Sequence, residues 1–376
     1  MRNIDRVLAA LEEHRGATHS WLVGEPCFAP PPELTVALAE AAQSASFRYP
    51  PHEGLPELRQ ALATLHRTFD QPVVRDQIAV TNGAKGGLLA LLATLLEPGD
   101  ELIHPLPCYP AYPMMASRLG ARPVGVRETG WGFSGWIESI VSRIGPRTRA
   151  VVLSSPSNPT GTTLSSDTAR SLVDLCRHHD IRLISDEAYA DFLFANGQKG
   201  LPSIHDPDRT TIVQVRSASK SWALCGWRVG WLIADPPLIT RIARTHASLV
   251  NPASGPAQAA LCALTDISDT YLEAARALVD SRMNVLSSAL AKEGISHEKA
   301  DGGFYLWLDV GRQIETAGVE NAVEWCVDLA RRFGIGLWPG EDFGGPGHIR
   351  IAATAPTDEN WQPAVEALSE ALSFEF

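Results

Sequence analysis

Lys220 lies in the stretch "SASKSWALCGWRVGW" (217–231), with serines on both sides and an arginine eight residues further on. A lysine amine forms imines with carbonyl compounds, so it serves as a nucleophile in covalent catalysis. The hydroxyls of Ser217 and Ser219 can donate hydrogen bonds, and the guanidinium of Arg228 can bind two oxygens of a phosphate at once. The stretch therefore predicts a reactive lysine beside a phosphate site, with an ordinary surface lysine as the alternative.

Polar residues also follow the other β-rich runs of the chain. Tyr109, Asn158, Asp186 and Tyr189 each lie at or shortly after the end of such a run. In an open parallel sheet, ligands bind beyond the carboxyl ends of the strands. Taken singly, each residue has a structural explanation as a turn residue or a helix cap. Their joint placement at strand ends favours a single binding site.

The chemistry that these residues share is specific. The motif "NGAKGG" (82–87) opens an apolar helix, and backbone amides at a helix N-terminus bind phosphate with the help of the helix dipole. A buried carboxylate, Asp186, would keep a pyridine nitrogen protonated, and the ring of Tyr109 would stack on a flat heterocycle. A phosphate, a protonated pyridine and a lysine together describe pyridoxal 5'-phosphate, with Lys220 forming the imine with its aldehyde.

The sequence resembles the class I and II aminotransferases, which belong to the fold-type I pyridoxal-phosphate enzymes. The resemblance extends in order over nearly the whole chain, which makes it specific for the family and less specific for the reaction. The motifs that carry it are "GEPCFAPPPEL", "RYPPHEGLPELRQALA", "VTNGAKGGL", "PGDELIHPLPCYPAY", "SSPSNPTG", "SDEAYADF", "SASKSWALCGWRVGW", "GGFYLWLDV" and "HIRIAAT".

The resemblance implies a role for each residue of the cofactor site. Lys220 corresponds to the Schiff-base lysine, which also shuttles the proton during transfer. Asp186 corresponds to the partner of the pyridine nitrogen, and Asn158 and Tyr189 to the pair that hydrogen-bonds the phenolic oxygen. Tyr109 corresponds to the aromatic residue that stacks on the ring. The residues expected to bind the phosphate, with those of the helix N-terminus acting chiefly through backbone amides, are Gly83, Ala84, Lys85, Ser217, Ser219 and Arg228.

The resemblance also implies how the substrate is bound. Arg350, within "HIRIAAT", corresponds to the arginine that binds the substrate α-carboxylate. A guanidinium suits this role because its two parallel N–H groups match a carboxylate. Gly24 corresponds to the backbone that receives this carboxylate, and Asn158 also belongs to the substrate site. Tyr49 corresponds to a tyrosine that reaches the phosphate in the neighbouring subunit, so the resemblance implies a homodimer.

The side-chain specificity of the substrate stays open at the level of the sequence. Thr18–Val23, Tyr112, Asn251–Ser254 of a neighbouring subunit and Trp338 are expected near the substrate. Trp21 and Trp338 would suit an apolar or aromatic substrate side chain, and they would equally suit the core. No second arginine can be assigned to a distal carboxylate, so acidic substrates are neither supported nor excluded.

The elements that must position these residues alternate between helical and β-rich patterns, which predicts an α/β fold. Apolar spacing predicts helices over 34–43, 56–69, 85–96, 166–179, 236–247, 256–264, 270–293, 320–333 and 358–373. The β-rich runs are "QIAVT", "ELIHP", "RPVGV", "RAVVLSS", "IRLISDE", "TIVQVRS", "RVGWLIA", "FYLWLDV" and "HIRIAAT". With the resemblance, this pattern predicts a fold-type I aminotransferase: a large domain with a mostly parallel seven-stranded sheet between helices, and a smaller α+β domain.

The expected domain boundaries follow from the order of these elements. Residues 1–45 form an N-terminal segment that is expected to pack with the small domain. Residues 46–270 form the large domain, which binds pyridoxal 5'-phosphate, and residues 271–376 form the small C-terminal domain.

Composition limits the possible partners and the compartment. The chain has 376 residues and a formal net charge of -11, so binding to nucleic acid or to an anionic membrane is not expected. Its longest strongly apolar stretch, Leu88–Leu96, is too short to span a bilayer, and the N-terminus does not resemble a signal peptide. The six cysteines are scattered without a metal-ligand spacing, which predicts free thiols in the cytoplasm and no metal site.

The leading functional hypothesis is transfer of an amino group from an α-amino acid to a 2-oxo acid. Related reactions on the same apparatus are the alternative: elimination, cyclisation or oxidation of an amino acid, which differ by pocket residues and not by the cofactor motifs. A regulator that uses this domain as a sensor would need a DNA-binding segment, and the stretch before "GEPCF" is too short for one.

Overall fold

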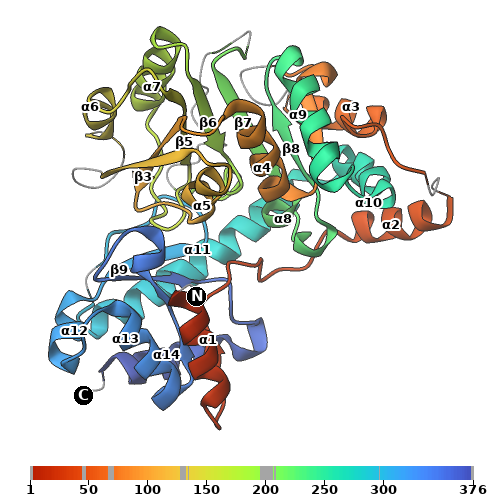
Figure 1. Cartoon of the computed structure of the whole chain (residues 1–376). Helices are drawn as coiled ribbons and strands as arrows, with labels where there is room; N and C mark the ends of the chain where they lie inside the picture. The colour runs from red at the N-terminus through yellow and green to blue at the C-terminus, as the bar shows by residue number, and fades with distance from the viewer. Residues whose placement is uncertain are drawn as a thin grey trace.

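The computed structural model describes residues 3–44, 48–66, 72–127, 133, 135–194, 206, 209–295 and 297–373. Figure 1 shows a larger unit, in which helices surround a sheet, above a smaller unit that gathers the N-terminal helix and the C-terminal helices. Helix α11 (Asp269–Lys292) runs from the larger unit into the smaller one.

The larger unit is built on a sheet of seven strands. These are β2 (Ile78–Thr81), β3 (Glu101–Leu106), β4 (Arg122–Arg127), β5 (Thr148–Ser154), β6 (Arg182–Asp186), β7 (Ile212–Ser217) and β8 (Gly230–Ile233). They lie in the order β2-β8-β7-β6-β5-β3-β4. Strand β8 is antiparallel to both of its neighbours, and the other pairs are parallel. The predicted mostly parallel seven-stranded sheet is confirmed.

Helices cover both faces of this sheet and one of its ends. They are α2 (Pro32–Ser44), α3 (Pro56–Leu65), α4 (Gly83–Leu95), α5 (Ala111–Arg118), α6 (Trp136–Val141), α7 (Ser166–His178), α8 (Ala218–Ser221), α9 (Pro236–Val250) and α10 (Gly255–Ala260). Helix α4 contains most of the apolar stretch that the sequence singles out; its Leu88, Leu91 and Leu92 are buried in the core, and Leu89 and Leu95 are partly buried against it.

Alternating residues of a strand enter different apolar layers. In β5, Ala150 and Val152 lie in the cluster that includes α4, α5 and α9. Val151 and Leu153 lie in the cluster that includes α6 and α7. Because successive side chains of a strand point to opposite faces, a strand covered on both faces must be apolar throughout. The unbroken run "AVVL" in β5 is the sequence signature of this burial.

The smaller unit combines short strands with long helices. Its elements are α1 (Asn3–Glu13), β1 (His19–Ser20), most of α11, β9 (Tyr305–Asp309), α12 (Gly311–Ala317), α13 (Ala322–Phe333), β10 (Ile335–Gly336), β11 (Trp338–Pro339), β12 (His348–Ala352) and α14 (Trp361–Ser373). Strand β12 is central and antiparallel to β9 and β11, and β1 pairs with β10 in parallel. This register places Arg350 between Trp307 and Trp338.

The N-terminal segment is shared between the two units. Helix α1 packs against α13, and its buried residues belong to the same core as the C-terminal helices. Helix α2 packs instead against α10 of the larger unit, where Leu34 lies in one cluster with Leu58 and Trp231. The expectation that all of residues 1–45 pack with the small domain therefore differs from the placement of α2, whose apolar side faces the larger unit. The domain boundaries themselves stay a prediction.

The long helices agree with the apolar patterns, and so does the short α10, which overlaps the predicted helix 256–264. Four other short helices were not expected. Helices α5, α6, α8 and α12 have eight residues or fewer, which is too short for a 3.6-residue period to repeat convincingly. Among the described residues, no helix is long and apolar enough to cross a membrane.

Candidate active site

A cavity of about 490 Å³ lies at the carboxyl ends of β5, β6 and β7, and its walls come from both units. Gly83 and Tyr49 are the predicted site residues that do not contribute to its walls. The predicted residues that line it are Gly24, Ala84, Lys85, Tyr109, Asn158, Asp186, Tyr189, Ser217, Ser219, Lys220, Arg228 and Arg350.

Lys220 lies in α8, a single helical turn that begins where β7 ends. The hydroxyl of Ser217 caps this turn by accepting a hydrogen bond from the backbone amide of Ser219 at 3.1 Å. The Lys220 side chain is half-buried, and its Nζ donates to the carbonyl of Gly24 at 2.6 Å. The amine is thus held in the cavity by the segment that leads towards α2.

Asp186 ends β6 and is buried, with 6% of its surface exposed. Its carboxylate accepts hydrogen bonds from the backbone amide of Ala188 at 3.2 Å and from the hydroxyl of Tyr112 at 2.8 Å. Burial raises the pKa of Asp186 to about 6, an effect that these hydrogen bonds oppose. The carboxylate is therefore largely ionised at neutral pH in an environment that favours a nearby cation.

Tyr112 is a site residue whose role the sequence did not reveal. It was expected near the substrate, whereas its hydroxyl reaches Asp186 and its side chain is buried. A signal was present, because Tyr112 follows Tyr109 by three residues, and the backbone amide of Tyr112 donates to the carbonyl of Tyr109 just before α5. The two rings meet edge to face at 5.6 Å.

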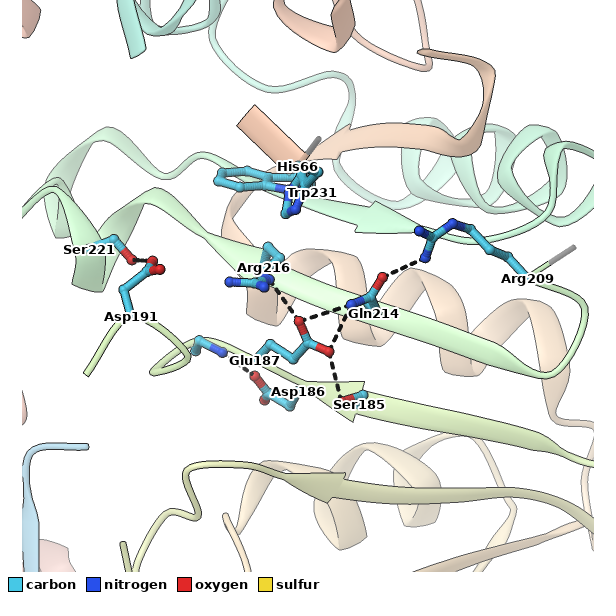
Figure 2. A network of polar contacts seen from close by, with 11 residues as sticks. His66, Ser185, Asp186, Glu187, Asp191, Arg209, Gln214, Arg216, Ser221 and Trp231 are labelled. Atoms are coloured by element: carbon cyan, nitrogen blue, oxygen red, sulfur yellow. Dashed lines mark hydrogen bonds and ion pairs between the residues drawn. The ribbon is translucent and has the colours of Figure 1, made fainter. Parts of the chain in front are cut away.

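Behind Asp186, β6 and β7 are joined by a buried ion pair (Figure 2). Nε of Arg216 lies 2.8 Å from Oε2 of Glu187, and both side chains are almost fully buried. Glu187 also accepts hydrogen bonds from Ser185 and Gln214. Because neighbouring residues of an extended chain point to opposite sides, Asp186 faces the cavity while Glu187 faces this ion pair.

The expected phosphate site combines a helix N-terminus with Arg228. Gly83 begins α4 with a φ of +69°, and a Cβ there would collide with the guanidinium of Arg228. A Cβ on Gly230 would collide with the amide nitrogen of Ala84. Arg228 itself adopts the left-handed conformation with a φ of 56°, which is uncommon outside glycine and concentrates at functional sites. A glycine is therefore required at position 83 because Arg228 approaches the start of α4 closely. Gly83 does not itself line the cavity.

Arg350 is the most deeply buried cation of the cavity, with 2% of its surface exposed. Its Nη1 donates to Oδ1 of Asn158 at 2.9 Å, and its Nη2 donates to the carbonyl of Leu22. Its guanidinium lies 4.1 Å from the ring centroid of Tyr305 and 4.4 Å from that of Trp338. Its Nε is buried without a hydrogen-bond partner among the described residues. Burial lowers the pKa of Arg350. The unpartnered Nε leaves the guanidinium with an N–H group that can donate to an anion.

Tyr189 pairs with Tyr305, a second residue that the sequence did not assign. Their hydroxyl oxygens lie 2.5 Å apart, and their rings meet edge to face at 5.4 Å. The motif "GGFYLWLDV" contains Tyr305, and the alternation of β9 indicates its face. The sequence could not predict that Tyr305 pairs with Tyr189, because this contact depends on how the two units pack.

Several residues that were expected near the substrate have other surroundings. Trp21 is fully buried and packs edge-on against Trp361 at 5.7 Å, so it belongs to the core of the smaller unit. Trp338 lines the cavity, as does Val23 at the end of the stretch from Thr18. Asn251–Ser254 lie outside the walls of this cavity, and their placement against a neighbouring subunit stays a prediction.

A family model described as aminotransferase class I and II matches residues 19–368. The chain belongs to this family. It is 33% identical over 338 residues to the arginine–pyruvate transaminase of Pseudomonas aeruginosa, which covers 88% of this chain and 84% of that protein. The aspartate/prephenate aminotransferase of Thermus thermophilus is 32% identical over 356 residues, 93% of this chain and 89% of that one. A double mutant of the Thermus thermophilus aspartate aminotransferase matches with a TM-score of 0.90 at 29% identity, over 99% of this chain and 96% of that chain.

The protein is thus an aminotransferase that uses pyridoxal 5'-phosphate and moves the amino group of an α-amino acid to a 2-oxo acid. The relatives and the solved structure named above are all transaminases or aminotransferases. The cavity of this aminotransferase fits the cofactor: a buried carboxylate at Asp186, an amine at Lys220, and a glycine-lined helix N-terminus beside Arg228 are the groups that a protonated pyridine, an aldehyde and a phosphate require.

Proposed function

We propose that Lys220 binds the aldehyde of pyridoxal 5'-phosphate and then moves the proton at the substrate α-carbon. Its Nζ lies in the cavity, 5.8 Å from the ring centroid of Tyr189 and hydrogen-bonded to the carbonyl of Gly24. When bound, the cofactor supplies an aldehyde that condenses with amino groups and a ring that withdraws electrons from the α-carbon. Lys220 is the half-buried lysine of the cavity, whereas the side chain of the other lining lysine, Lys85, is exposed.

Asp186, Asn158 and Tyr189 hold the polar edge of the ring in this proposal. Asp186 keeps the ring nitrogen protonated, because a buried carboxylate is stabilised by an adjacent cation. Oδ1 of Asn158 is engaged by Arg350, so its amide NH₂ remains to donate to the phenolic oxygen. Tyr189 donates to the same oxygen, and burial, which raises its pKa, keeps it a neutral donor. Tyr109 stacks on the ring.

The phosphate is bound at the start of α4 in this proposal. The backbone amides of Ala84 and Lys85 and the hydroxyls of Ser217 and Ser219 donate to its oxygens, and Arg228 neutralises its charge. The side chain of Lys85 is exposed, so its backbone carries its contribution.

Arg350 binds the α-carboxylate of the amino acid, and the backbone of Gly24 lies beside it. The observation that carries the proposed function is that Lys220, Asp186, Tyr189 and Arg350 line one cavity although they come from elements far apart in the chain. Aromatic rings around Arg350 exclude water from the guanidinium, which strengthens its interaction with a carboxylate.

The working enzyme is a homodimer in this proposal, with Tyr49 reaching the phosphate in the neighbouring subunit. Tyr49 is 79% exposed and does not line the cavity of its own chain, which supports a role across an interface. All six cysteines are free thiols, which supports our proposal of a location in the reducing cytoplasm.

The role of Arg350 is tested by pairing substrates with and without an α-carboxylate. A panel of amino acids with pyruvate or 2-oxoglutarate as acceptor first identifies a good donor. Arg350→Lys keeps the positive charge but loses the paired N–H groups that bind a carboxylate at two points. KM for that donor should therefore rise about 10- to 100-fold. Turnover of the matching amine without a carboxylate should change little. The exposed Arg241→Lys serves as the control. Equal losses for amino acid and amine would contradict the assignment of Arg350 to the carboxylate.

A further inference from the structure

Tyr305, which has no role in the proposed chemistry, contacts several groups of the site at once. Its hydroxyl lies 2.5 Å from that of Tyr189, and its ring lies 4.1 Å from the guanidinium of Arg350. The same hydroxyl lies so close to Gly24 that a Cβ there would collide with it. Tyr305 is 3% exposed and comes from β9 in the smaller unit, whereas Tyr189 follows β6 in the larger one.

The direction of the hydrogen bond between the two phenols follows from proton counting. A phenol has one proton to donate, together with lone pairs that accept. If Tyr189 donates its proton to the phenolic oxygen of the cofactor, the proton between the two hydroxyls must belong to Tyr305. A hydroxyl that accepts one hydrogen bond becomes a better donor in the next, because the bonds polarise one another.

We propose that Tyr305 is a positioning residue that donates a hydrogen bond to Tyr189 and so orients and polarises the phenol facing the cofactor's phenolic oxygen. This inference rests on the proposed role of Tyr189. The packing supports it: the ring of Tyr305 is held by Arg350 on its face and by Tyr189 at its edge, which leaves its hydroxyl little freedom. The smaller unit thereby supplies a group that acts on the cofactor through the larger unit.

The test is a pH titration of the visible absorbance of the enzyme loaded with pyridoxal 5'-phosphate. A donor to the phenolic oxygen stabilises the negative charge of that oxygen. The Lys220 nitrogen that is bound to the cofactor then becomes less basic, and its titration sets the pH midpoint of the absorbance change. Tyr305→Phe weakens that donor, so the pH midpoint should rise by roughly 0.5 to 1 unit. Tyr271→Phe is the matched control, because its hydroxyl donates to the carbonyl of Ala29 outside the cavity. An unchanged midpoint in a folded Tyr305→Phe enzyme would overturn the inference.

A double-variant cycle separates a relay through Tyr189 from a direct effect of Tyr305. Tyr189→Phe should raise the midpoint by more than Tyr305→Phe, and adding Tyr305→Phe to it should change nothing further. Equal shifts in both backgrounds would show that Tyr305 acts by another route. If Tyr189→Phe itself leaves the midpoint unchanged, the proposed role of Tyr189 fails. If Tyr189→Phe moves it and Tyr305→Phe does not, only the role of Tyr305 fails.

A second pair of variants separates the hydroxyl from the ring. Tyr305→Phe keeps the ring beneath Arg350, so KM for the amino acid should stay within about 3-fold of the wild-type value. Tyr305→Leu removes the ring as well, and KM should rise about 5-fold or more because the cation–π contact is lost. Should Tyr305→Phe be unstable, Gly24→Ala displaces the same hydroxyl and should also raise the midpoint. A folded Gly24→Ala enzyme with the wild-type midpoint would overturn the inference.

Discussion

Asp186 is a carboxylate that burial disfavours until a cation arrives. A phenol and a backbone amide donate to it, yet its pKa is raised from the ordinary 3.8 to about 6, chiefly by burial. Because the folded protein binds this proton more tightly than the unfolded chain does, the free energy of unfolding should fall as the pH rises from about 4 to 6. At neutral pH the cofactor-free enzyme thus carries a destabilising charge at the residue that is proposed to bind the ring nitrogen.

Asp186→Asn should stabilise the cofactor-free enzyme at pH 7 and should change its stability little at pH 4. The pKa rise from 3.8 to about 6 corresponds to an upper value of roughly 3 kcal/mol at pH 7. Urea denaturation at both pH values measures the effect, with the exposed Asp174→Asn as the control. With the cofactor bound, the variant should lose its advantage and most of its activity. A cofactor-free Asp186→Asn enzyme that is less stable than wild type at pH 7 would contradict this account of Asp186.

At this scale, the sequence predicts which residues gather and misses how they are linked. The sequence predicts the residues that follow strands or lie within family motifs, as Lys220, Asp186 and Arg350 do. Tyr112 and Tyr305 escaped because their partners, Asp186 and Tyr189, are set by packing between elements. A phenol near a site has many possible partners, and spacing alone does not choose among them.

At the scale of elements, the ion pair between Glu187 and Arg216 joins β6 to β7 where both strands deliver site residues (Figure 2). Asp186 and Ser217 stand next to these two residues in the chain. Any shift between the strands therefore moves the carboxylate of Asp186 relative to α8, which carries Lys220. The pair is buried, so removing one of its two residues leaves the other as an uncompensated charge away from water.

Breaking this ion pair from one side should be costly. Glu187→Met or Arg216→Met alone should lower the free energy of unfolding by about 3–5 kcal/mol, because the remaining charge stays buried without its partner. Combining Arg216→Met with Glu187→Met should cost less than the sum of the single changes. Thermal and urea unfolding measure both, and removal of the exposed pair Asp167 and Arg170 should cost less than about 1 kcal/mol. Strictly additive losses would contradict a coupled pair.

The elements themselves differ in how well their sequence predicts them. Helix α7 was predicted over 166–179 and α11 over 270–293, each within one residue of the observed bounds, because their apolar periods repeat over several turns. Helices α6 and α12 have six and seven residues, which gives the period no room to repeat. The placement of α2 on the larger unit was missed because an apolar stripe does not name the surface that it covers.

At the scale of the whole molecule, the cavity lies between two units, and the proposed dimer would complete it from outside. Lys220 and Asp186 come from the larger unit, whereas Arg350 and Tyr305 come from the smaller one. Helix α11 connects the two units in one continuous element (Figure 1). Tyr49 is exposed and is proposed to act in the neighbouring site.

Tyr49→Phe should weaken the affinity for pyridoxal 5'-phosphate about 10- to 100-fold, the effect of losing a hydrogen bond to a charged group. Mixing it with Lys220→Ala, which is expected to be inactive, tests whether Tyr49 acts across an interface. In a mixed dimer, the subunit with the intact lysine receives a wild-type Tyr49 from its partner. Activity at limiting cofactor should therefore exceed that of either variant alone. No gain after subunit exchange, verified with a tagged subunit, would place Tyr49 in its own site or in none.

The most direct test of the account identifies the lysine that carries the cofactor. Borohydride reduction of the loaded enzyme, followed by tryptic digestion and mass spectrometry, fixes the bond between lysine and pyridoxal 5'-phosphate and locates it. We predict the added mass on Lys220, within an uncleaved peptide from Ser217 to Arg228. Modification of Lys85, the other lysine that lines the cavity, or of no residue in the cavity would contradict the central claim.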